Sequence, residues 1–110
     1  MKINLSPVFS EESIEASVNM DSITINGVAF DFSRLPAGYE LPSSAIETEH
    51  FTGSVIRDEA GHIELTLRFP HPYDASENMR FPEPVITEEG PVKFPVNTTP
   101  KADIKDTEND

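Results

Sequence analysis

The stretch that decides the fold reads Ser22-Ile23-Thr24-Ile25-Asn26-Gly27-Val28-Ala29-Phe30-Asp31-Phe32. A type I′ turn needs positive φ at two successive residues, and Asn followed by Gly tolerates this conformation. With the turn at Asn26-Gly27, Ile25 lies opposite Val28. Ile23 then lies opposite Phe30, so the apolar side chains share one face. Because the turn chemistry and the side-chain pattern agree, we predict an antiparallel β-hairpin over residues 22–32.

A second hairpin is predicted over residues 50–69. Glu59-Ala60-Gly61 suits a three-residue loop, in which a type I turn is closed by a glycine in the left-handed region. The register that follows pairs Val55 with Leu65, Gly53 with Leu67 and Phe51 with Phe69. A slip by one residue would scatter the apolar set over both faces, which favours this register.

A third hairpin is predicted over residues 80–95. Glu88-Glu89-Gly90 repeats the chemistry of the second loop and sets Ile86 against Val92. The strands of this hairpin contain several prolines, which cannot donate a hydrogen bond to a sheet. These prolines are Pro82, Pro84, Pro91 and Pro95. We therefore expect this hairpin at a sheet edge.

Shorter signals complete the pattern. Ile3 and Leu5 alternate with polar residues and predict a short strand that Pro7 interrupts. A second alternation, with the period of a half-buried strand, comprises Ile14, Ala16, Val18 and Met20. Residues 33–49 read as a connection, with one helical turn after Pro42. Three apolar residues are expected to anchor this connection to the core: Leu35, Leu41 and Ile46.

These signals predict an all-β protein. We expect a small antiparallel sheet or sandwich built from three β-hairpins, with at most one or two short helical turns. The β domain is predicted over residues 1–96. Residues 97–110 hold four acids, two lysines and few apolar residues, and are expected to form an acidic disordered tail.

Composition excludes several classes of function. The 110-residue chain carries a formal net charge of −12 and has no cysteine. Such an acidic chain is repelled by nucleic-acid phosphates and by anionic membranes, so we expect no direct binding to either. No apolar run approaches the roughly 20 residues of a membrane helix, and the first residues turn polar too soon for a secretory signal. We expect a soluble, cytoplasmic protein.

No catalytic, metal or cofactor signature stands out. In the predicted register His50 and His71 point to opposite faces, and His62 lies at the far end of the hairpin, so a shared metal site is not expected. Neighbouring acids near the predicted turns are expected to be solvated surface groups: Glu11-Glu12, Asp58-Glu59 and Glu88-Glu89. We therefore predict that the protein is not an enzyme and binds no cofactor.

The best candidate contact surface spans residues 68–81, where arginine, aromatic and proline residues gather in an irregular stretch. Tyrosine and arginine are over-represented at binding hot spots. The candidate protein-binding residues are Arg68, His71, Tyr73, Arg80 and Phe81. The alternative is structural: Phe69 and Phe81 belong to the core, and Tyr73 covers a sheet edge.

Several segments together resemble a family of small bacteriophage and prophage proteins of uncharacterised activity. The resemblance rests on residues 1–8, residues 23–36 and residues 63–71, together with Arg80-Phe81-Pro82-Glu83-Pro84 and Glu89-Gly90-Pro91-Val92. It covers about residues 1–96 and contains no catalytic motif. It implies a gene in the tail or tail-fibre region, and a protein that lies in the host bacterial cytoplasm or is associated with the virion.

Three functions are compatible with these observations. The first is a non-enzymatic accessory or assembly protein of the phage tail module, whose partner is a tail or tail-fibre protein. The alternative is an acidic phage-encoded inhibitor of a host nucleic-acid-binding protein, which would act as a DNA mimic. Residues 1–96 carry a net charge of −10, but most of the acids fall singly or in turns rather than in one stripe. The third is a small hydrolase or sugar-binding module, which the β architecture alone does not support.

Overall fold

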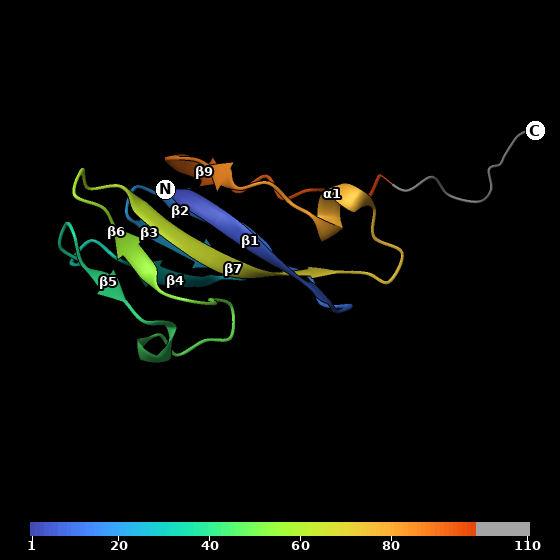
Figure 1. Cartoon of the computed structure of the whole chain (residues 1–110), viewed down its shortest axis with the longest axis horizontal. Coiled ribbons are helices and arrows are strands. Elements are labelled where there is room, and N and C mark those ends of the chain that lie inside the picture. The colour runs from blue at the N-terminus through green and yellow to red at the C-terminus, as the bar shows by residue number, and fades with distance from the viewer. Residues whose placement is uncertain (99–110) are drawn as a thin grey trace, which may run out of the picture.

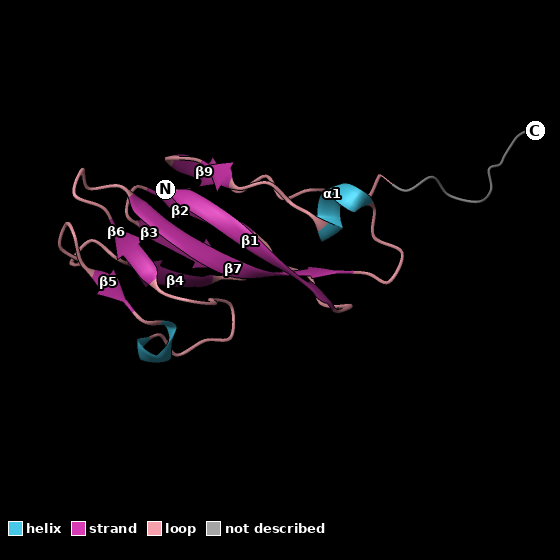
Figure 2. Ribbon diagram, in the orientation of Figure 1, coloured by secondary structure: helices cyan, strands magenta, loops and turns pink. Residues whose placement is uncertain are grey.

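The computed structural model describes residues 1–98, which form two β-sheets with two short helices (Figure 1; Figure 2). Sheet A has the strand order β5-β6-β7-β1-β8 and sheet B the order β4-β3-β2-β9. The strands of sheet A are β1 (Lys2–Phe9), β5 (Glu40–Leu41), β6 (Val55–Arg57), β7 (Ile63–His71) and β8 (Val85–Ile86). The strands of sheet B are β2 (Ala16–Asn19), β3 (Ser22–Ile25), β4 (Val28–Asp31) and β9 (Glu89–Pro91). The helices are η1 (Ser43–Ala45) and α1 (Glu77–Arg80). The all-β prediction is confirmed.

The core lies between the two sheets, which are stacked as layers (Figure 1). Ile3, Leu65 and Leu67 of sheet A are fully buried. Ile23 and Ile25 of sheet B are fully buried as well, in the same apolar cluster. Both sets follow the alternation of a strand with one buried face. The architecture is therefore a sandwich, as one form of the prediction stated.

The hairpin at Asn26-Gly27 is confirmed in turn and in register. Its turn residues have φ of 48° and 87°, in the left-handed region that a type I′ turn requires. Ile25 pairs with Val28, and Ile23 pairs with Phe30. Asn26 also ties the turn to the start of β2, because its side-chain Oδ1 accepts a hydrogen bond of 2.8 Å from the Glu15 backbone N–H.

The strand expected around residues 14–20 forms only over Ala16–Asn19, so it starts after Ile14 and ends before Met20. β2 pairs with β3 in a hairpin of its own, with Asn19 opposite Ser22. Met20 therefore lies in the turn, where its φ is 56° and its side chain is exposed. The alternation could not reveal this, because Met20 has the apolar character of a strand residue and no glycine marks the turn.

The second hairpin is confirmed at its turn and wrong in register farther away. The Asp58 N–H donates to the His62 carbonyl over 2.9 Å, which closes the predicted loop of residues 59–61. Ile56 opposite Glu64 fits the predicted register. Phe51, however, bridges to Leu67 instead of Phe69. The chain bulges at Gly53, whose φ is 71°, and the bulge shifts every residue before it.

The third hairpin does not form. β8 pairs with β1 in sheet A, whereas β9 pairs with β2 in sheet B. Residues 85–91 therefore cross from one sheet to the other, and Ile86 does not face Val92. Each of these strands lies at the end of its sheet, so the proline-rich segment does supply sheet edges. The loop predicted at Glu88–Gly90 is wrong as well, because the chain bends at Glu88 but Glu89 and Gly90 belong to β9.

The expectation of a purely antiparallel sheet is also wrong, because β1 and β7 pair in parallel along the whole of β1. Pro7 does not interrupt β1, which runs on to Phe9. The Ser10 N–H donates to the His71 carbonyl over 2.9 Å. Since amide directions alternate along a strand, the nitrogen of Pro7 faces away from β7. β8 pairs only with Lys2 and Ile3, so Pro7 removes no sheet hydrogen bond.

The connection predicted over residues 33–49 is confirmed in part, because Glu40–Leu41 within it form β5, an outer strand of sheet A that the sequence did not predict. Its helical turn forms as η1, and Leu35, Leu41 and Ile46 are partly buried against the core. After β7, helix α1 places buried Met79 against the same core. The end of the described chain returns to this helix, because the Thr98 N–H donates to Ser76 Oγ over 2.8 Å. The tail predicted over residues 97–110 lies outside the described residues from 99 onward.

Arg57 joins the two sheets at one end of the sandwich. Its guanidinium donates to the carbonyl oxygens of Leu35, Phe32 and Gly61. It also donates to Asp21 Oδ2 over 3.0 Å, and only 11% of the Arg57 side chain is exposed. A guanidinium offers five N–H donors in a fixed planar fork, whereas a lysine ammonium offers three from a single nitrogen. We call Arg57 and these four partners the arginine clamp.

Candidate protein-binding surface

At the other end of the β1–β7 pair, two aromatic rings lie exposed. Phe9 is the last residue of β1, opposite His71, and Tyr73 follows two residues after β7. The rings pack edge to face with their centroids 6.3 Å apart. Phe9 is 60% exposed and Tyr73 is 87% exposed. Exposed aromatic rings in mutual contact are typical of a surface that a partner covers.

The acids next to these rings give the surface a negative charge. Glu11 and Glu12 follow Phe9, and Asp74 follows Tyr73; all three are exposed. No lysine or arginine lies between residues 3 and 33 or between residues 69 and 79. We define the aromatic tip as Phe9, Tyr73 and the three acids Glu11, Glu12 and Asp74.

The structure separates the predicted binding residues. His71 and Tyr73 lie at the aromatic tip, where His71 Nδ1 is 2.9 Å from the Pro72 carbonyl oxygen. Arg68 is half-buried on the outer face of sheet A, because it alternates with buried Leu67 and Phe69 along β7. Arg80 and Phe81, both exposed, lie at the end of α1.

The alternative interpretation of residues 68–81, in which the aromatic residues are structural, holds for Phe69 only. Phe69 is buried and stacks on Phe94 at a centroid distance of 5.7 Å. Phe81 is 71% exposed, so it is not a core residue. It lines a cleft of about 570 Å³ with Pro84, Lys93 and Pro95.

Phe9 was missed as a surface residue. The sequence reading ended the first strand at Pro7, which left Phe9 without a neighbour. Its contact with Tyr73 depends on the parallel pairing of β1 with β7, whose residues are more than sixty positions apart. A local pattern carries no signal for such a pairing, because the connection between parallel strands is long.

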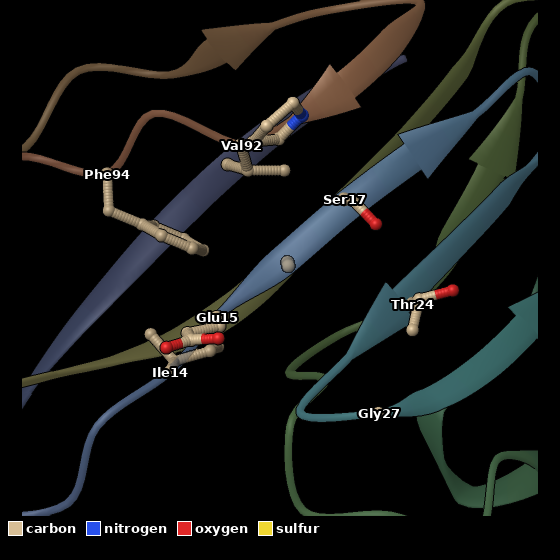
Figure 3. Close-up of a pocket in the computed structure, with 9 residues that line it drawn as sticks. Ile14, Glu15, Ser17, Thr24, Gly27, Val92 and Phe94 are labelled. Atoms are coloured by element: carbon tan, nitrogen blue, oxygen red, sulfur yellow. The ribbon is translucent and has the colours of Figure 1, made fainter.

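A further cleft of about 420 Å³ lies beside β2 (Figure 3). Its walls come from β2, β3 and the chain that follows β9, with Phe94 and Val92 on one side and Ser17 and Thr24 on the other (Figure 3). Among the described residues that line it, Glu15 is the one ionisable side chain. A single carboxylate offers no acid and base pair for catalysis.

The histidines do not converge with acids on a shared centre. Within residues 1–98 no group of three or more histidine, cysteine, aspartate or glutamate side chains is placed to hold a metal ion. The Arg68 N–H donates to the His50 carbonyl over 2.8 Å, so His50 lies beside residue 68 rather than beside residue 70, where the predicted register of the second hairpin places it. The bulge at Gly53 causes this difference. His62 lies at the turn, with Nδ1 3.6 Å from Asp58 Oδ2.

One of the turn carboxylates has a shifted proton affinity, which the sequence reading did not anticipate. The His62 backbone N–H donates to Asp58 Oδ1 over 2.8 Å, and this bond lowers the pKa of Asp58 below its ordinary value of 3.8. Asp58 is therefore charged at neutral pH and is a poor proton donor.

In the described part of the chain no helix is long and apolar enough to cross a membrane.

No protein-family model, curated protein or solved structure matches this chain.

Proposed function

We propose that this protein is a non-enzymatic accessory or assembly protein of a phage tail module, and that it acts by binding another protein through the aromatic tip. The observation that carries the binding function is the pair of exposed rings, Phe9 and Tyr73, which contact each other at the end of the β1–β7 pair. The sequence resemblance supplies the tail module as the setting, with the host cytoplasm or the virion as the location.

The aromatic tip has the make-up of a small binding surface. Two rings that already contact each other lose little side-chain entropy when a partner covers them. The acids around them favour a lysine- or arginine-bearing segment, whose cations can also lie over an exposed ring. By contrast, the guanidinium at the other end donates to three carbonyl oxygens and one carboxylate within the chain, and little of the Arg57 side chain is exposed.

The test is co-expression of the tagged full-length chain with individual phage tail and tail-fibre proteins, followed by affinity capture. We expect the wild-type chain to retain at least one of them, and a Phe9→Ser, Tyr73→Ser double variant to lose it. Ile86→Ser is the matched control, since Ile86 is 73% exposed on a different strand, and it should bind as the wild type does.

Two outcomes would contradict the proposal. Equal capture by the wild type and the double variant would move the binding surface away from the aromatic tip. Capture of no tail protein, together with salt-sensitive capture of a host nucleic-acid-binding protein, would replace the tail function with inhibition by charge mimicry.

A further inference from the structure

Within residues 1–98, three of the four outermost strands have a proline within them or next to them, and one does not. β5 is followed by Pro42, β8 is preceded by Pro84 and β9 contains Pro91. Proline has no N–H group to offer to an added strand, which is how natural sheets avoid pairing at their edges. β4, the outermost strand of sheet B, has no proline within it or next to it.

The backbone of β4 has free hydrogen-bonding groups along its outer side. In a hairpin with a two-residue turn, Val28 and Phe30 exchange backbone hydrogen bonds with β3. The amide and carbonyl groups of Ala29 and Asp31 therefore point away from β3. Both residues are exposed, and within residues 1–98 these backbone groups have no partner. Four successive residues thus present an edge that is ready to pair.

We propose that the protein forms a symmetric dimer in which β4 pairs antiparallel with β4 of a second copy, with Ala29 opposite its own counterpart. In this register Gly27 lies opposite Asp31 and Val28 opposite Phe30, on both sides of the two-fold axis. The pairing would join the two four-stranded sheets into one continuous sheet.

The side chains of β4 are self-complementary in this register. Val28 is 56% exposed and lies on the face of sheet B that also carries buried Ile25. Phe30 lies on the same face and is only partly covered, by its edge-to-face contact with Phe51. In the dimer each Val28 lies beside the Phe30 of the other copy, which covers both. Aromatic and β-branched cross-strand pairs are among the favourable ones.

The charge of Asp31 selects this register over its neighbours. The Ser33 backbone N–H, 2.9 Å from Asp31 Oδ1, lowers the pKa of Asp31, so this carboxylate is charged at neutral pH. With Ala29 at the centre, the two Asp31 residues lie about 13 Å apart along the strands, beyond the Debye length of about 8 Å at physiological salt. A register centred on Asp31 would set the two carboxylates directly opposite each other.

The size and charge of the interface predict a weak, salt-dependent dimer. Four-residue strands bury little surface, so we expect dissociation constants of about 10–1000 µM. Each copy carries a net charge of −12, and the two copies repel each other. Salt should therefore strengthen the association, whereas it weakens contacts between opposite charges.

The test is sedimentation velocity of the full chain from about 10 µM to about 1 mM protein, at about 50 and 500 mM NaCl. We expect a concentration-dependent dimer that is stronger at the higher salt concentration. Val28→Asp should weaken it at least tenfold, because it sets a charge against the Phe30 of the other copy. Ile86→Asp, the same change at an exposed residue of β8, should leave it unchanged.

Amide hydrogen exchange locates the interface independently of the variants. The amides of Ala29 and Asp31 should exchange more slowly as the protein concentration rises, whereas exposed amides on other edges should not. A monomer at 1 mM in high salt would overturn the proposal. So would a dimer that resists Val28→Asp, or one that leaves the Ala29 amide unprotected; either would show that the copies meet elsewhere.

Discussion

The two ends of the β1–β7 pair differ in how their side chains are satisfied. At one end, the guanidinium of Arg57 reaches three carbonyl oxygens and one carboxylate, and little of it is exposed. At the other end, Phe9 and Tyr73 contact each other and little else, and most of each ring is exposed. The first arrangement joins the two sheets, whereas the second leaves apolar surface exposed. Substitutions in the arginine clamp should therefore lower the free energy of unfolding. Substitutions at the aromatic tip should change it little.

The largest effect on stability is expected from Arg57→Met. The change removes every donor of the arginine clamp, so Asp21 and the carbonyls of Leu35 and Gly61 lose the guanidinium, while the Phe32 carbonyl keeps the Leu35 N–H. We expect the free energy of unfolding to fall by about 3–5 kcal/mol. Urea denaturation followed by circular dichroism measures this loss. Arg57→Lys keeps the charge but not the planar geometry, and should recover only part of it. A loss below about 1 kcal/mol would show that the clamp is dispensable.

A smaller effect is expected from Gly27→Ala in the β3–β4 turn. Gly27 has a φ of 87°, and no atom lies within 4 Å of the position that a Cβ would take. The substitution should therefore lower the free energy of unfolding by about 1–2 kcal/mol, because a residue with a Cβ is strained in the left-handed conformation. Thermal denaturation of the variant and of the wild type, measured in parallel, should show a lower midpoint for the variant. An unchanged midpoint would mean that the turn relaxes, and would question the turn type.

At the aromatic tip, Tyr73→Ser should change stability by less than about 0.5 kcal/mol, because the ring is 87% exposed. Urea denaturation measured in parallel with Arg57→Met makes the comparison direct. A large loss of stability here would show that the tip supports the fold, and that its exposure does not mark a binding surface.

The smallest effect concerns pH. Because the pKa of Asp58 is lowered in the folded protein, the stability that this group contributes is fully present above its unfolded pKa and is lost as the pH falls through the folded value, below 3.8. Asp58→Asn should flatten the decline of the unfolding midpoint in acid. Thermal scans from pH 6 to pH 2 of both proteins test this. Parallel curves would contradict the role of the His62 hydrogen bond.

The elements that the sequence predicted well are those set by local chemistry. Asn26-Gly27 fixes both the turn and the register of its hairpin, because the turn geometry determines which residues face each other. The loop at residues 59–61 likewise fixes the pairing of the residues next to it. The register failed beyond Gly53, since a glycine inside a strand pattern does not reveal whether the chain bulges there.

The pairings between distant segments could not be predicted. β1 and β7 pair in parallel, and β8 and β9 join different sheets, although the loop between them resembles a hairpin turn. These pairings are decided by burial in the finished core rather than by neighbouring residues. The aromatic tip follows from them, so the sequence identified Tyr73 but not Phe9. The arginine clamp was missed for the same reason, because its partners come from three separate segments.

The most direct test of the central claim is the affinity of the Phe9→Ser, Tyr73→Ser double variant for a tail protein that the wild-type chain captures. Calorimetric titration of both proteins, with their thermal midpoints measured alongside, separates binding from folding. If the aromatic tip is the binding surface, the dissociation constant rises at least about 30-fold while the midpoint stays within about 2 °C. An unchanged dissociation constant would contradict the assignment of the tip as the binding end.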